Sequence, residues 1–335
     1  MQLKMNEWTA SPEHLRRLAQ TGVLPSAALE RALQIAGVVP DGARWRSFVS
    51  TLLLLMGSLM LAAGVIFFFA YNWADMGRFQ KFGLVQVALL GAVMTASYVG
   101  LDSMAAKASL LLASFLVGAF LALFGQVYQT GADAYELFLG WAALIVGWVL
   151  IGRFSFLWLL LLALLETGYI LYWVQVLEPE WLTRRYLFLF ESLFGMNLVA
   201  LALWELFASH GVEWLSGRWA PRLIGSAACT FLTIPMIIVI FADSYGRQDL
   251  FPGFVQLLYV LFVALTGWFY QRAKQDLFLI AAAMLSVITV LTVYFAKKIG
   301  SHYGGYLLLA LVVVGMASGG AVWLRKLSRS GEETS

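Results

Sequence analysis

The stretch VSTLLLLMGSLMLAAGVIFFFA, residues 49–70, contains no charged side chain. A hydrocarbon core of about 30 Å is crossed by about twenty apolar residues in an α-helix. The apolar residues form a continuous run and do not alternate with polar ones, which excludes a strand of a membrane β-barrel. This stretch therefore predicts a transmembrane helix.

Nine further apolar blocks of similar length follow along the chain. The 335 residues are 61% hydrophobic and 12% charged, whereas a soluble domain carries about 25% charged residues. The lone Cys229 lies inside one block, so no disulfide framework is expected. The sequence predicts an all-α, polytopic membrane helix bundle of about ten transmembrane helices, with a tight hairpin at Gly152-Arg153. The nine further spans are residues 82–101, 108–127, 135–151, 154–176, 187–208, 220–242, 253–271, 277–296 and 304–324.

Lysine and arginine predict the orientation of the bundle. With the N-terminus in the cytoplasm, fifteen of them lie on the cytoplasmic side and seven on the other, as the positive-inside rule requires. The sequence thus predicts that both termini are cytoplasmic, with residues 325–335 as a tail. The excess of Lys and Arg comes from the termini. If one span were miscounted, the predicted location of the C-terminus would change to the other side of the membrane.

Residues 1–48 predict a short cytoplasmic helical hairpin. SPEHLRRLAQTG has Ser11 as an N-cap and Gly22 as a stop, and SAALERALQIAG repeats the scheme with Ser26 and Gly37. The hairpin packs on the bundle or the membrane surface, or it binds a protein partner. Nucleic-acid binding is disfavoured, because the basic residues are not concentrated on the second helix.

Two segments about 140 residues apart resemble each other. ALFGQVYQTGADAYELFLGWAA, from Ala122, and ALTGWFYQRAKQDLFLIAAA, from Ala264, share A-L-x-G-x-x-Y-Q and L-F-L. Residues 49–176 and 187–324 would then form two halves of five spans each, in opposite orientations. Such a five-plus-five inverted repeat is typical of secondary transporters, although chance similarity is the alternative in a chain this rich in Ala and Leu.

Three acidic residues interrupt the predicted spans. A charge at the centre of a membrane helix costs about 2.5–3.5 kcal/mol, so Glu166, in the middle of its span, is a candidate proton or cation site. Asn197 lies near mid-depth of the next span and is a second candidate. A Glu166 hydrogen-bonded to a neighbouring helix is the structural alternative. Glu191 and Glu205 share one helix face near the membrane surfaces, where they are interpreted as structural.

Helix capping explains several other polar residues. Asp133 and Glu136 form a capping box, D-x-x-E, where the fourth span begins, and Thr130 caps in the same style. Asn72 and Asp75 repeat the device after the first span. Capping does not explain Gln126, Tyr128 and Gln129 at the end of the third span. These three are the remaining candidates for an intramembrane polar site. The pair Tyr128-Gln129 has a counterpart in Tyr270-Gln271.

AYNWADMGRFQKFGL (residues 70–84), GQVYQTGADAYELFLGWA (residues 125–142) and TGVLPSAALERAL (residues 21–33) resemble a family of predicted bacterial membrane proteins, domain of unknown function twenty-one fifty-seven. The resemblance covers roughly residues 10–175. It implies a bacterial inner-membrane protein and supplies no activity, so no catalytic residue is carried over.

Two functional hypotheses follow, and an enzyme is disfavoured. The first is a transporter for a small solute, or an ion-coupled one, in which a water-accessible cavity should reach Glu166. The second is a non-enzymatic scaffold, sensor or assembly factor of the envelope that acts through residues 1–48. The chain has no H-E-x-x-H, G-x-S-x-G or phosphate-binding glycine loop. We expect no catalytic residue, no metal and no cofactor. The sequence implies the lipid bilayer as a partner and offers residues 1–48 as a candidate site for a protein partner, and the oligomeric state stays open.

Overall fold

The computed structural model of the chain describes residues 15, 18–36, 42–72, 76–129, 131–177, 183–242, 252–272, 274, 276–299 and 305–334. Within these residues all regular structure is helical, and ten helices are long and apolar enough to cross a membrane. The prediction of an all-α polytopic bundle with about ten spans is therefore confirmed.

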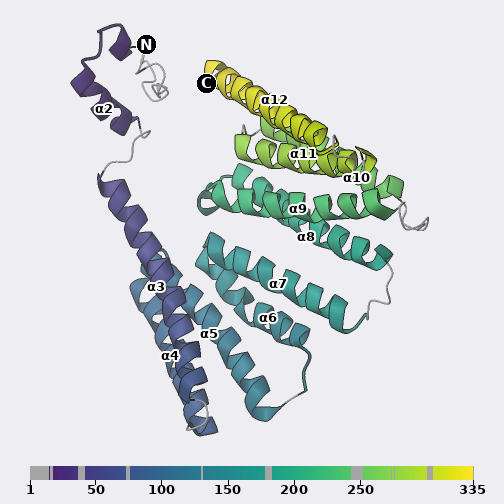
Figure 1. The fold of residues 1–335 in the computed structure, drawn as a ribbon. Helices are drawn as coiled ribbons and strands as arrows, with labels where there is room; N and C mark the ends of the chain where they lie inside the picture. Colours follow the sequence, from purple (N-terminus) through teal and green to yellow (C-terminus); the bar gives the residue numbers. More distant parts are fainter. Residues whose placement is uncertain are drawn as a thin grey trace. The chain divides into compact units, whose positions relative to one another are not determined.

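The helices follow the predicted spans in order (Figure 1). A short helix, α2 (Ser26–Ile35), comes first, and one turn of 3₁₀ helix, η1 (Glu213–Leu215), joins the sixth and seventh spans. The ten long helices are α3 (Gly42–Asn72), α4 (Arg78–Val99), α5 (Met104–Tyr128), α6 (Ala134–Gly152), α7 (Ser155–Gln175), α8 (Thr183–Ser209), α9 (Trp219–Ala242), α10 (Pro252–Arg272), α11 (Leu277–Ile299) and α12 (Gly305–Thr334).

The chain divides into two compact units. One comprises Met1–Gly77 and Val87–Ala113, and the other comprises Arg78–Gln86 and Ser114–Ser335. The second unit holds α6 to α12 complete, so the predicted boundary between the two halves falls inside it. The five-plus-five repeat stays a prediction.

In the second unit, neighbouring helices pack along the chain order. Helix α6 packs on α7 and α8 on α9, while α11 contacts α9, α10 and α12 (Figure 1). Large apolar side chains remain exposed on the outside of these helices, among them Leu265 at 61% and Leu311 at 62%. An exposed apolar surface of this extent suits contact with lipid chains.

Two helices extend beyond the predicted spans. Helix α3 begins at Gly42, before the predicted boundary at residue 49, and α12 continues to Thr334 through most of the predicted tail. Hydropathy marks where a helix leaves the hydrocarbon, but the backbone hydrogen bonds continue into the polar segment. The boundaries of the predicted hairpin and tail therefore do not coincide with helix ends.

The N-terminal segment has the predicted turn at Gly22. Leu15 and residues 18–20 are helical, and Gly22 has a φ of 77°, a left-handed conformation that glycine adopts without strain. The predicted N-cap at Ser26 is wrong, because Pro25 occupies the N-cap position of α2. Ser11 and Gly37 lie outside the described residues.

The predicted hairpin between the fourth and fifth spans is confirmed. Helix α6 ends at Gly152 and α7 begins at Ser155. Arg153 ends α6 in the left-handed conformation, with a φ of 42° and a ψ of 47°. One left-handed residue reverses the chain within three positions.

A close contact joins α5 and α6 at Gly118. The indole N–H of Trp141 donates to the Ser114 carbonyl oxygen at 2.6 Å, which fixes the ring over the next turn of α5. A Cβ added at Gly118 would lie 2.5 Å from this ring. Glycine here permits the approach of the two helices, as small residues do in membrane bundles.

Substitution Gly118→Ala should destabilise the second unit, since overpacking costs about 1–3 kcal/mol. The thermal midpoint of the purified protein in detergent should fall. Gly147→Ala is the matched control, because Gly147 also lies inside a helix and a Cβ there would meet nothing within 4 Å. An unchanged midpoint in Gly118→Ala would contradict this packing.

Candidate functional site

The structure brings Glu166 and Asn197 together. The Asn197 side-chain amide donates to Glu166 Oε1 at 2.6 Å and to the Leu193 carbonyl oxygen at 2.9 Å. Asn197 is 1% exposed, and Glu166 is partly buried. Both residues lie near the middle of their helices, α7 and α8, and therefore at mid-depth of the bilayer. The pair is a polar contact between two helices that are otherwise apolar at this level.

The other three candidates lie at the end of α5. Tyr128 is 52% exposed and packs beside Phe82 and Phe124, with ring centroids 5.8 and 4.8 Å away. Gln126 is exposed. Gln129 follows the last helical residue with a φ of 45°, so its backbone ends the helix. These side chains form an aromatic and polar helix end that has no described contact with Glu166.

The helix start after this turn differs from its predicted capping. Asp133 is the N-cap residue of α6, as predicted, but its side chain makes no capping hydrogen bond. The Tyr135 backbone N–H instead binds Gln175 Oε1 of α7 at 3.4 Å. Glu136 lies in the first turn, and Gly131 has a φ of 65°. The acceptor at this helix start is therefore Gln175 of α7, whereas the sequence predicted the Asp133 carboxylate.

The remaining capping residues add little. Asn72 is the last residue of α3, and α4 begins six positions later at Arg78. Thr130 and Asp75 lie outside the described residues.

Tyr128 and Tyr270 occupy the ends of corresponding helices but differ in their surroundings. Tyr270 is 3% exposed and donates its hydroxyl to Glu205 Oε1 at 3.2 Å, whereas Tyr128 is half exposed. The matched sequence positions therefore do not form a matched pair of sites.

Glu205, which accepts the Tyr270 hydroxyl, belongs to an ion-paired cluster in the second unit. Arg218, just before α9, donates to Glu205 of α8 at 2.8 Å and to Asp276 at 2.9 Å. Arg222, one turn into α9, donates to both oxygens of Asp276 at 3.1 Å. Asp276 also accepts the Phe278 backbone N–H at 3.1 Å and so caps α11. We call Glu205, Arg218, Arg222, Tyr270, Lys274 and Asp276 the ion cluster.

Sequence analysis missed this cluster. Glu205 was interpreted as structural without a partner being assigned, and it is 6% exposed and ion-paired with Arg218. The partners lie in three separate segments of the chain, so no local spacing reveals them. The one local signal was Asp276, an acidic residue directly before an apolar helix, which is the usual composition of an N-cap.

Two members of the ion cluster that lie outside the spans, Asp276 and Arg218, have shifted pKa values. Burial alone would raise the pKa of the Asp276 carboxyl, but hydrogen bonds from Arg222 and Arg218 outweigh it, and the pKa falls below its ordinary value. Burial alone would lower the pKa of Arg218, yet its bonds to Glu205 and Asp276 raise it. Asp276 and Arg218 are therefore charged at neutral pH.

A crevice of about 450 Å³ runs between α9 and α11 from this end. Hydroxyl side chains line it at helical spacing, with Ser226, Thr230 and Thr233 on α9 and Ser286 and Thr289 on α11. Ser226 lies one turn from Arg222 and donates to its carbonyl oxygen at 2.7 Å. Serine and threonine are common where membrane helices meet, because they allow close approach and can hydrogen-bond across the contact.

The crevice ends in a continuous chain of hydroxyl groups. Thr233 donates to the Cys229 carbonyl oxygen at 2.6 Å. Because each hydroxyl has one hydrogen, Ser286 then donates to Thr233 at 2.6 Å, and Tyr259 donates to Ser286 at 2.8 Å. Pro235, which lacks an N–H, follows two residues after Thr233 inside α9. Three helices thus share one hydrogen-bond chain at mid-depth.

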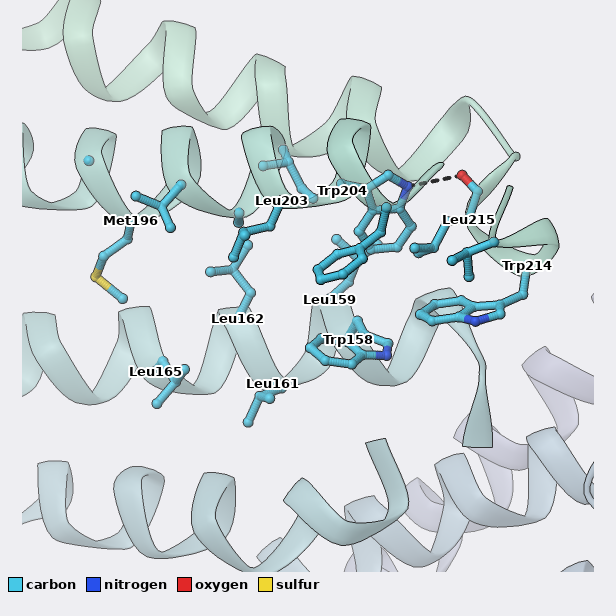
Figure 2. A pocket seen from close by; sticks show the side chains of 16 residues that line it. Trp158, Leu159, Leu161, Leu162, Leu165, Met196, Leu203, Trp204, Trp214 and Leu215 are labelled. Carbon is cyan, nitrogen blue, oxygen red and sulfur yellow. Dashed lines mark hydrogen bonds between the residues drawn. The ribbon is translucent and has the colours of Figure 1, made fainter. Parts of the chain in front are cut away.

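A second cavity is apolar and has a different character. It measures about 870 Å³ and lies between α7 and α8. Figure 2 shows its aromatic end, where Trp158, Trp204 and Trp214 gather and the Trp204 indole donates to the Leu215 carbonyl oxygen at 3.2 Å. Neither Glu166 nor Asn197 lines this cavity or the α9–α11 crevice, so neither is the cavity that the transporter hypothesis expects to reach Glu166. Its apolar walls suit hydrocarbon and exclude an ion.

The fold and these polar features define a polytopic α-helical membrane protein. Residues 16–158 match the model of DUF2157, a family described as predicted membrane protein. The resemblance found in the sequence is therefore confirmed for this part of the chain. No curated protein matches the chain, and no solved structure matches it.

Substitution Asp276→Asn should test the ion cluster. Asparagine keeps the capping group but removes a charge that two arginines surround, and breaking a buried pair costs about 3–5 kcal/mol. The thermal midpoint should fall at pH 7. Because the native pKa of Asp276 lies below its ordinary value of 3.8, the stabilisation exists above that value and is lost as the pH falls through the native pKa.

The difference between wild type and Asp276→Asn should therefore narrow below about pH 4. The exposed Asp102 provides the control, as Asp102→Asn should leave the midpoint unchanged. A difference that is the same at pH 7 and at pH 3.5 would argue against an electrostatic role.

Proposed function

We propose that this protein is a multi-pass, non-enzymatic transporter of the bacterial inner membrane that moves a small polar solute or an ion, with both termini in the cytoplasm. The observation that supports it most is the hydroxyl-lined crevice between α9 and α11. The resemblance and the excess of Lys and Arg at the termini support the location and orientation.

The crevice offers polar groups where a bare bilayer offers none. From Arg222 to Thr233 the helix rises about 16 Å, about half of a hydrocarbon core of roughly 30 Å. Along this length Ser226, Thr230 and Thr233 line the crevice, and each donates its hydroxyl hydrogen to a carbonyl oxygen of α9, which leaves the hydroxyl oxygen as an acceptor. A solute that leaves water at the ion cluster would meet these oxygens in turn. The hydroxyl chain from Tyr259 to Thr233 would receive it at mid-depth.

Glu166 serves in this proposal as the coupling group. A carboxyl at mid-depth is stable when it holds a proton or a cation, so a change in its charge can be linked to solute movement. Asn197 keeps it in place through the 2.6 Å hydrogen bond. Phe194, one turn before Asn197 on α8, packs in the same cluster as Cys229 and Tyr259, so α8 contacts residues next to the crevice one turn away from Asn197.

Accessibility of Thr230 tests the crevice. Thr230→Cys in a Cys229→Ala background should react with a membrane-impermeant thiol reagent in inside-out vesicles, because water follows the hydroxyl groups to this level. Cys229→Ala alone gives the background. Val260→Cys on α10, 61% exposed and outside the crevice, is the lipid-facing control and should not react. If Thr230→Cys stays as unreactive as Val260→Cys, the crevice is closed to water and the transport path is lost.

Glu166→Gln separates coupling from structure. Glutamine keeps an oxygen that accepts the Asn197 hydrogen bond, so the thermal midpoint should change little. Uptake driven by a proton gradient into proteoliposomes should be abolished, measured with a panel of small solutes. A variant that transports like wild type, or one that loses stability with no transport phenotype, would assign Glu166 a structural role.

A second candidate function is an envelope scaffold, sensor or assembly factor. The observation that favours it is the exposure of apolar residues in the N-terminal segment, with Val23 at 72% and Ile35 at 79%. Such residues suit a protein partner. Deletion of residues 1–45 distinguishes the two functions: a scaffold loses a co-purifying partner, whereas a transporter keeps its uptake.

A further inference from the structure

A second groove lies between α8 and α10 and shares no lining residue with the α9–α11 crevice. It measures about 690 Å³. Apolar side chains line most of its length, including Phe194, Leu198 and Leu201 on α8 and Leu258, Leu261 and Leu265 on α10. Its polar lining residues, Glu205, Ser209, Thr266, Tyr270 and Lys274, gather toward the ion cluster.

The charged end presents one acceptor and one cation. Glu205 Oε1 accepts Arg218 at 2.8 Å and Tyr270 at 3.2 Å, but the buried Oε2 makes no hydrogen bond. The Glu205 side chain is 7% exposed. Lys274 Nζ forms an ion pair with Oε2 at 3.7 Å, a distance too long for a hydrogen bond. A buried carboxylate oxygen without a donor costs stability, so this end favours a ligand that carries N–H groups.

The apolar part favours a hydrocarbon chain. Water would lose hydrogen bonds against these walls, and a void would forfeit dispersion contacts. From Phe194 to Ser209 the helix rises about 22 Å, which exceeds the thickness of one leaflet of a core of about 30 Å. An acyl chain that enters from the charged end can lie in the groove along its whole length.

We propose that the groove between α8 and α10 is a specific site for phosphatidylethanolamine. Its acyl chain lies between the two helices, its phosphate pairs with Lys274, and its ammonium group donates a hydrogen bond to Glu205 Oε2. The headgroup has one anion and one N–H donor, as the groove has one cation and one acceptor. Phosphatidylcholine carries the same phosphate, but its quaternary ammonium has no hydrogen to donate.

Native mass spectrometry tests this site with the full chain in mixed micelles that hold equimolar phosphatidylethanolamine and phosphatidylcholine with identical acyl chains. Wild type should retain phosphatidylethanolamine in preference by about tenfold, the factor that corresponds to about 1.4 kcal/mol. Lys274→Gln should remove most of this retention. Arg272→Gln is the matched control, because Arg272 is exposed at the same end of α10 and does not line the groove.

Glu205→Gln should abolish the preference for phosphatidylethanolamine over phosphatidylcholine. If loss of the ion pair with Arg218 unfolds this variant, Lys274→Gln still tests the proposal. Equal retention of the two lipids by wild type would overturn the proposal, since the groove would then hold ordinary boundary lipid. Retention of phosphatidylglycerol with the same dependence on Lys274, but without preference for phosphatidylethanolamine, would also overturn it, because Lys274 would then bind a phosphate alone.

Discussion

The bridge that Arg218 forms between Glu205 and Asp276 is the constraint on which the α8–α11 part of the structure depends. One guanidinium binds a carboxylate from α8 and the residue that caps α11. Tyr270 brings the end of α10 to the same carboxylate. Charges removed from water are stable only when they are paired and hydrogen-bonded. The ends of four helices are therefore held at one place, because moving any one of them away leaves a buried charged group without one of its partners.

This constraint gives the helices their two kinds of interface. Next to the ion cluster, α9 and α11 pack closely, and hydroxyl side chains line the crevice between them, among them the hydrogen-bonded pair Thr233 and Ser286. Helices α8 and α10 are joined through Glu205 and Tyr270 at one end and diverge around the apolar groove. The helices that meet at the ion cluster therefore have a polar interface between α9 and α11 and an apolar groove between α8 and α10. The proposed transport path and the proposed lipid site use different faces of the same arrangement.

The sequence predicts local features of this protein well. Continuous apolar runs identify the ten spans, and single residues such as Gly22 and Arg153 lie at turns because short-range backbone geometry determines them. The polar candidates were harder to interpret. Glu166 and Asn197 were selected separately, and only the packing of α7 on α8 joins them. Capping at Asp133 failed because a residue from another helix, Gln175, supplied the acceptor. Long-range pairing decides the partners of buried polar groups, and local spacing does not contain that information.

A double-mutant cycle between Glu205→Gln and Arg218→Gln tests the central claim most directly. Unfolding free energies of wild type, the two single variants and the double variant would be measured in the same bicelles. If the bridge organises the helix ends, the double variant should be less destabilised than the sum of the single variants by at least about 1 kcal/mol, within the range of 0.5–3 kcal/mol found for residues in one network. Additivity within about 0.5 kcal/mol would contradict it, because such independent effects are typical of residues that do not interact.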